Sequence, residues 1–174
     1  NLISKKIEEN NQNISLEFKK IKFKFDIKNF SLFLNTNNPI IYYKEVKIPL
    51  KNIKVYLDLI PLIKSQPKIE KIVFLSNELD IDELKKITFK LKPSNITGII
   101  NNKIESGKIK TELEIYLTEN QELKNFIAKG SAREVGVSIQ KKIKLENIKF
   151  DFFFDKSDFL IKNIFGLLDG VEIK

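Results

Sequence analysis

Hydrophobic and polar residues alternate along most of this chain with a period of two. Clear examples are "IKFKFDI" (21–27), "NIKVYLDL" (52–59) and "KIKTELEIYLTEN" (108–120), where apolar side chains occupy every second position. Successive side chains of a β-strand point to opposite faces of the sheet, so this alternation produces one apolar and one polar face. The pattern therefore predicts amphipathic strands.

The same alternation predicts between eight and eleven strands in sequential order. After 14–34, "NTNNP" (35–39) is rich in turn-forming residues and predicts a turn, followed by a hairpin arm over 40–50. Further strands are expected near 52–59, 68–75, 108–120 and 126–140, with two more in 142–166 and a last one at the end. Short connections favour antiparallel neighbours, and so a meander.

Helical spacing is confined to short stretches. The first 13 residues predict a short amphipathic helix, and 76–87 predicts a short strand that runs into a helical turn. Pro93-Ser94 followed by isoleucines at helical spacing predicts a helix over 94–106 that ends at Gly107. These helices are too few to cover a sheet of the expected size.

The predicted fold is therefore mostly β: a long twisted antiparallel meander curled into a groove, with one to three short helices, in a single domain over 1–174. Its apolar face either lines an open groove for acyl chains or closes a core against a second sheet. The alternating pattern leaves both possibilities open. The candidate lipid-binding residues of the groove are Ile53, Val55, Leu57, Leu59, Leu113, Ile115, Leu117, Phe150, Phe152 and Phe154.

Composition removes several kinds of chemistry. The sequence contains no Cys and no His, which excludes disulfides, zinc sites of the usual ligands, thiol nucleophiles and histidine acid–base catalysis from these residues. Since it contains no Met, not even at position 1, we expect an excerpt of a longer chain. No stretch approaches 18 uncharged apolar residues, the length needed to span a bilayer as a helix.

The formal net charge of +8 is weak evidence for a nucleic-acid partner. Of the 31 basic residues, 30 are Lys and one, Arg133, is Arg. Arg is the preferred residue for bidentate contacts with phosphates and base edges. Abundant Lys, Ile and Asn are also what an AT-rich coding bias produces, so we expect no nucleic-acid partner.

Two polar segments are candidates for chemistry. The acidic cluster of Glu78, Asp80, Asp82 and Glu83 offers oxygen ligands for a hard cation, but it lacks the glycine and the distal glutamate of a calcium loop. "GSAREVG" (130–136) matches neither a phosphate-binding nor a dinucleotide-binding loop. We expect no catalytic residues, no metal and no cofactor, and hence no enzyme.

Residues 25–87 resemble the AsmA-like family of bacterial envelope proteins. The resemblance rests on an alternating strand that ends in Asp58-Leu59, an apolar turn at Leu62-Ile63, and the strand "IEKIVF" (69–74). The later β-rich part, 126–174, is similar to the long body of the larger members, in which strands and glycine-containing turns repeat. The stretch "LIPLI" (59–63) corresponds to a short helical turn in this comparison.

The resemblance implies a lipid-transport protein with a repeating β-groove. Such proteins carry phospholipid through the periplasm towards the outer membrane, and they are anchored in the inner membrane. An anchor of this kind would lie outside the present sequence, and other envelope proteins are possible partners.

Two alternatives belong to other classes. One is a structural or scaffold β-domain with a closed core that binds protein partners at its sheet edges. The other is a basic nucleic-acid-binding domain.

Overall fold

The structure is a computed structural model, and it describes residues 14–17, 20–27, 31–63, 66, 68–91, 93–139 and 143–174. The helix predicted for residues 1–13 lies outside this part of the chain. The strands are β1 (Ile14–Glu17), β2 (Ile21–Asp26), β3 (Ser31–Asn37), β4 (Ile40–Tyr43), β5 (Val46–Leu57), β6 (Ile69–Ser76), β7 (Leu79–Asp80), β8 (Ile104–Leu117), β9 (Leu123–Ile139), β10 (Ile143–Asp155), β11 (Phe159–Leu168) and β12 (Val171–Ile173). The helices are α2 (Leu59–Ile63), α3 (Ile81–Thr88) and α4 (Asn95–Asn102).

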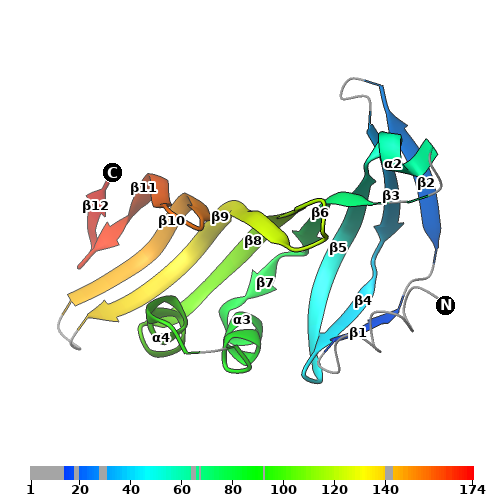
Figure 1. Ribbon diagram of the computed structural model, residues 1–174. Helices are drawn as coiled ribbons and strands as arrows, with labels where there is room; N and C mark the ends of the chain where they lie inside the picture. The colour runs from blue at the N-terminus through cyan, green and yellow to red at the C-terminus, as the bar shows by residue number, and fades with distance from the viewer. Residues whose placement is uncertain are drawn as a thin grey trace.

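The twelve strands form one antiparallel sheet in the order β1-β4-β5-β6-β8-β9-β10-β11-β12. In addition, β2 pairs with β3, β3 pairs with β5, and β7 pairs with β8. The strands lie side by side across the molecule as a twisted, curved sheet, and α3 and α4 lie at the end of the sheet where β8 begins (Figure 1). The prediction of a mostly β antiparallel meander with up to three short helices is confirmed.

The turn predicted for residues 35–39 is wrong. β3 and β4 both pair with β5 in one unbroken register, in which Leu32 lies opposite Leu57 and Ile41 lies opposite Ile48. The regular strand conformation is interrupted near Asn38, whose φ is 46°, but the chain continues in the same direction from β3 into β4. It reverses instead at Lys44 and Glu45, which have φ values of 45° and 70°. Because neither is Gly, Asn or Asp, the usual residues of such hairpin turns, the sequence signal was missing.

The helix predicted for residues 94–106 is shorter than expected. Ser94 caps α4, because its Oγ accepts a hydrogen bond from the Thr97 backbone N–H at 3.2 Å. The helix ends at Asn102, and β8 starts at Ile104. Gly107 therefore lies in a strand, with φ 144°, and its backbone approaches Val135 so closely that an added Cβ would meet the Val135 side chain at 3.0 Å.

The sheet is a single layer. Apart from marginal contacts, each strand of the described chain touches only its hydrogen-bonded neighbours, and no second sheet packs against it. The helix α3 contacts β5, β7 and β8, and α4 contacts β8. Ten hydrophobic residues of the described chain are buried, and six of them form two small clusters, one around Ile53 in β5 and one around Ala132 in β9. No described side chain is less than 2% exposed.

Candidate lipid-binding face

The strand registers bring apolar residues together on one face of the sheet. Residues directly opposite each other on paired strands share a face. Starting from Ile53 in β5, the pairing crosses five further strands and meets an apolar residue on each of them. This row is Ile53, Phe74, Leu113, Ala128, Phe154 and Phe159.

Neighbouring rows on the same face have the same character. The next row towards α2 is Val55, Ile72, Ile115 and Phe126. In the other direction follow the row of Thr111, Gly130, Phe152 and Ile161 and the row of Ile109, Ala132 and Phe150. We call these four rows, with Leu57 and Leu117, the apolar face.

Nine of the ten candidate lipid-binding residues therefore lie on one face. Leu57 and Leu117 continue the alternation of β5 and β8. The exception is Leu59, which begins α2 beyond the end of β5 and is half-buried there. Its place in the alternating pattern was misleading, because the strand already ends at Leu57.

Sequence reasoning missed about half of this face. Most of the missing members come from β6, β9 and β11, where a single strand shows alternation but does not show which residues of other strands lie on the same face. Only the register between strands assigns them to the same surface as Ile53. The missing members are Ile72, Phe74, Ile109, Thr111, Phe126, Ala128, Gly130, Ala132, Phe159 and Ile161.

Side chains of the apolar face are mostly half-buried. Ile53 and Leu57 are buried, and the other eight candidates have intermediate exposure. Their shielding comes from neighbours on the same face, since the described strands have no second layer above them. Phenylalanines contribute much of it: the ring centroids of Phe126 and Phe154 lie 5.4 Å apart.

Gly130 shows how closely these aromatic rings approach the sheet. A Cβ added to Gly130 would meet Cζ of Phe152 at 2.7 Å and the carbonyl oxygen of Lys110 at 2.0 Å. The ring of Phe152 thus lies over the glycine of the adjacent strand, and any side chain at position 130 would collide with this ring. Gly130 therefore allows the ring of Phe152 to pack closely against the sheet on the apolar face.

The apolar character continues to both ends of the sheet, where exposure is highest. At the β2 end, Phe23 lies opposite Leu34, which in turn lies opposite Val55, and Phe23 is 72% exposed. At the β11 end, Phe159 is 60% exposed. Exposed apolar surface that is continuous over several strands is unusual for a soluble monomer and marks an interaction site.

The opposite face of the sheet is polar in its central part. Phe33, Tyr56, Lys71 and Tyr116 lie opposite one another on four adjacent strands. Nζ of Lys71 lies 4.7 Å from the ring centroid of Tyr56 and 5.5 Å from that of Tyr116. A cation over an aromatic ring is attracted by the ring's negative face, and Nζ of Lys71 also lies 3.5 Å from a carboxylate oxygen of Glu114, so the charge of Lys71 is balanced by its neighbours on the sheet.

Glu114 is the centre of a charged network on this polar face. It is buried, and its carboxylate accepts hydrogen bonds from Nζ of Lys129 at 2.8 Å and from the Tyr116 hydroxyl at 2.6 Å. Burial alone would raise the pKa of Glu114, but the hydrogen bonds from Lys129 and Tyr116 outweigh it and lower this pKa to about 2. The hydrogen bond to Glu114 raises the pKa of Tyr116 to about 12.

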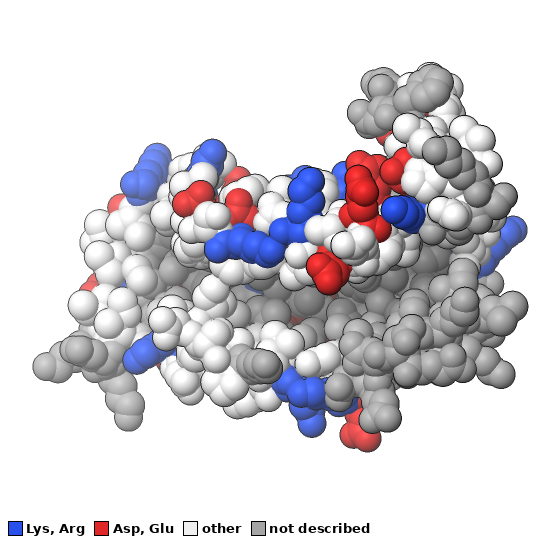
Figure 2. Space-filling view, in the orientation of Figure 1, with Lys and Arg blue, Asp and Glu red and all other residues white. Residues whose placement is uncertain are grey.

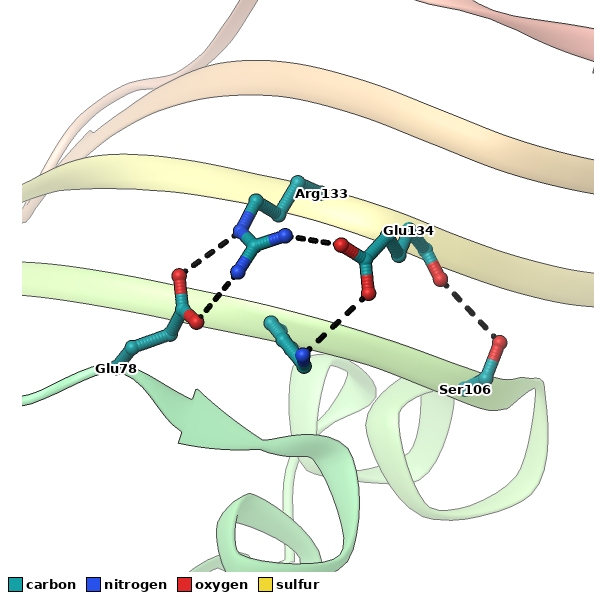
Figure 3. A network of polar contacts seen from close by, with 5 residues as sticks. Glu78, Ser106, Arg133 and Glu134 are labelled. Atoms are coloured by element: carbon teal, nitrogen blue, oxygen red, sulfur yellow. Dashed lines mark hydrogen bonds and ion pairs between the residues drawn. The ribbon is translucent and has the colours of Figure 1, made fainter.

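Arg133 holds the segment before β7 against the sheet (Figure 3). Its Nε and Nη2 donate to the two carboxylate oxygens of Glu78 at 2.9 Å and 2.7 Å, and Nη1 donates to Glu134. The hydrogen bond from Arg133 lowers the pKa of Glu78. Glu134 also pairs with Lys108 at 3.6 Å, so each charge in this network has a protein partner.

Three members of the acidic cluster that the sequence offered as a metal site, Glu78, Asp80 and Glu83, stabilise the local structure instead. Glu78 pairs with Arg133, while Asp80 caps α3 and Glu83 completes the capping box, its carboxylate accepting from the Asp80 backbone N–H at 3.2 Å. Within the described ranges, no three acidic side chains come together in a way that would hold a metal ion.

Charges of both signs are interspersed on the visible surface (Figure 2). In the same view the surface is hollowed between the strand ends above and the helices below. The longest helices of the described chain have eight residues, and none of the described helices is long and apolar enough to cross a membrane.

Comparisons with known proteins identify no relative. No family model matches the chain, and neither the curated proteins nor the solved structures include a significant match. The fold and the site together define a class: an open, single-layer antiparallel β-sheet with one continuous apolar face.

Proposed function

We propose that this domain binds the acyl chains of lipids on its apolar face and forms part of a lipid-transport protein. The observation that supports this proposal best is the run of apolar rows across a single-layer sheet. In the described chain, each strand from β5 to β11 in the sheet order contributes to the row of Ile53. Such a surface needs an apolar partner, and it offers no catalytic groups.

The dimensions of the face suit an acyl chain. Together with Leu34 of β3 and Phe23 of β2, which extend the row of Val55, the face covers eight adjacent strands from β2 to β11. With strands about 4.8 Å apart, the face is about 34 Å wide across the strands. One leaflet of a bilayer has a hydrocarbon thickness of roughly 15 Å, half of the roughly 30 Å core. An extended acyl chain therefore fits on the face with room to move along it.

The energetics favour continuous shielding over specific contacts. Each methylene group that leaves water gains about 0.8 kcal/mol. A chain of about 14 methylenes gains roughly 11 kcal/mol when it is fully buried, and about half of that on a face that shields one side. Because every row of the face is similarly apolar, a lipid loses little when it moves from one row to the next.

The resemblance to AsmA-like proteins supports a more specific proposal. In it, the chain is a segment of a bacterial envelope protein that guides phospholipid through the periplasm, between the inner and outer membranes. Membrane anchorage and envelope partners would be supplied by segments outside the present sequence. The central rows of the face include the strands that carry the resemblance, β5 and β6.

Two observations weigh against the alternatives. A scaffold domain with a closed core needs a second layer, and the described strands have none. Arg, the residue best suited to phosphates and base edges, occurs once in the chain, and this Arg133 is engaged by Glu78 and Glu134.

Native mass spectrometry of the purified protein tests the proposal. We expect mass increments of one or more phospholipids that persist through detergent-free purification, and that return when a delipidated sample is mixed with phospholipid vesicles. An unrelated protein purified in parallel controls for carry-over. Protein that carries no lipid and takes up none would contradict the proposal.

A further inference from the structure

The helical connection between β7 and β8 is unusually basic. Between Glu83 and Glu105 the sequence contains five Lys and no Asp or Glu, while the whole chain has a net charge of +8. This stretch of 21 residues thus has a net charge of +5, and the whole connection, residues 81–103, which also contains Asp82 and Glu83, has a net charge of +3. It contains the end of α3, the whole of α4 and the link between them.

The same connection exposes large apolar side chains. Phe89 is 69% exposed, and Leu91, just after it, is 43% exposed. On α4, Ile96 and Ile99 are 44% and 55% exposed. Their spacing of three puts Ile96 and Ile99 on one side of the helix.

A different part of α4 makes its contact with α3. The Thr88 hydroxyl donates a hydrogen bond to Oδ1 of Asn101 at 2.7 Å. Asn101 and Ile100 are less exposed than Ile96 and Ile99. The packing of the two helices therefore leaves much of the Ile96 and Ile99 side chains exposed to solvent.

Lysines surround Phe89 at the end of α3. Phe89, Lys86, Lys90 and Lys47 line one open pocket of about 550 Å³ between α3 and the start of β5, together with Glu45 and Glu83. The β4–β5 hairpin is tied to this site, since Nζ of Lys44 donates to the Lys90 carbonyl oxygen at 3.0 Å. Three lysines and two glutamates thus lie around the exposed ring of Phe89.

We propose that this surface, made of residues 84–91, 93–104 and the hairpin tip 44–47, docks on a bilayer that contains anionic phospholipids. Lysines attract the negatively charged lipid surface, and exposed apolar side chains enter the boundary between head groups and acyl chains. A nucleic acid would match the lysines but gives no reason to expose Phe89, Ile96 and Ile99. This inference goes beyond acyl-chain binding on the apolar face and does not depend on it.

Vesicle co-sedimentation of the whole protein tests the inference. The vesicles contain phosphatidylcholine alone or phosphatidylcholine with phosphatidylglycerol. A lysine near an anionic surface contributes about a factor of five in affinity, so Lys86→Gln with Lys90→Gln weakens binding to the anionic vesicles about 30-fold. Phe89→Ser with Ile99→Ser weakens it at least tenfold.

Matched controls are available at the other end of the sheet. Lys149→Gln with Lys162→Gln removes the same charge, and Ile164→Ser with Val171→Ser removes exposed apolar side chains of β11 and β12. Both control pairs keep wild-type binding, and urea unfolding confirms that all variants are folded.

Three results would overturn the docking surface. The first is that Phe89→Ser with Ile99→Ser binds vesicles as tightly as the wild-type protein does. The second is equal binding to neutral and anionic vesicles, and the third is a loss in the Lys86–Lys90 pair that affects duplex DNA but not vesicles. A variant with a charge on the apolar face, Ile115→Asp, keeps vesicle docking, so failure of acyl-chain binding and failure of docking are distinguishable.

Discussion

Ile115→Asp distinguishes an open apolar face from a closed core. Ile115 lies in the row with Val55, Ile72 and Phe126 and is half-buried. The matched control is Ile127→Asp: Ile127 lies on the adjacent strand, is also half-buried, and faces the other side of the sheet opposite Glu114. Both variants make the same chemical change in adjacent strands.

We expect a modest loss of stability in Ile115→Asp and a somewhat larger one in Ile127→Asp, because the new carboxylate at position 127 lies opposite Glu114 and Asp155. A fully buried Ile contributes about 1.5 to 3 kcal/mol, and a half-buried one about half of that. Adding the lower strand propensity of Asp, of up to about 1 kcal/mol, the free energy of unfolding falls by about 2 kcal/mol. With an m-value of about 2 kcal/mol/M, the midpoint of urea unfolding falls by about 1 M in Ile115→Asp and by up to about 1.5 M in Ile127→Asp.

Lipid binding separates the two variants. A carboxylate in contact with an acyl chain costs about 3 kcal/mol, as at the centre of a bilayer, so Ile115→Asp loses lipid affinity about 100-fold. Ile127→Asp keeps its lipid. The assays are urea unfolding by circular dichroism and native mass spectrometry at fixed lipid concentration.

A truly buried position supplies the comparison for stability. Ile53 is 4% exposed within its cluster, and Ile53→Asp loses about 5 kcal/mol, from the cavity and the buried charge together. If Ile115→Asp is destabilised as strongly as Ile53→Asp, the face is closed and the reasoning is refuted. Equal lipid binding by Ile115→Asp and Ile127→Asp would refute it as well.

Further predictions concern packing, pH and membrane docking. Gly130→Ala lowers the urea midpoint because its Cβ collides with Phe152 and Lys110, whereas Gly98→Ala, in α4 with open space around it, raises stability by up to about 1 kcal/mol. Glu114 has a lowered pKa of about 2, so its contribution is present above its unfolded pKa of about 4.3 and is lost as the pH falls from there towards 2. Glu114→Gln therefore destabilises by about 1 to 2 kcal/mol at pH 7, allowing for solvent screening, and by about half of that at pH 3, where part of the contribution is already lost. An equal loss at both pH values in urea unfolding would contradict the network. Lys86→Gln with Lys90→Gln binds anionic vesicles more weakly because the variant has less positive charge, and added salt weakens vesicle binding by the wild-type protein for the same reason.

Alternation predicted the strands because it reports the one property that a two-faced sheet imposes on every strand. The patterns around Leu113 and Phe152 indicated β8 and β10 to within about four residues. The arm predicted over 40–50 was wrong, because it joins β4, the reversal at Lys44 and Glu45, and the first residues of β5, which runs from Val46 to Leu57. The break at Asn38 was misread as a reversal, because Asn and Pro favour turns wherever the chain bends. The true reversal at Lys44 and Glu45 depends on positive φ values that these residues adopt only in the context of the paired strands.

The candidate site could be predicted in part for a similar reason. Alternation assigns each residue to one of two faces within its strand, so the members in β5, β8 and β10 were found. It does not say how strands are shifted against one another. The partners of Ile53 across the sheet, such as Phe74 and Ala128, follow from registers that include bulges, for example between Leu50 and Asn52. The charged network around Glu114 was missed because charges on a strand's polar face usually face water.

Photo-crosslinking to labelled phospholipid tests the central claim most directly. A benzoylphenylalanine placed at Val55 or Phe152 lies on the apolar face, and one placed at Phe153 lies next along β10 on the opposite face. The account predicts lipid crosslinks from positions 55 and 152 and none above background from position 153. Equal crosslinking from all three positions, or none from positions 55 and 152, would contradict it.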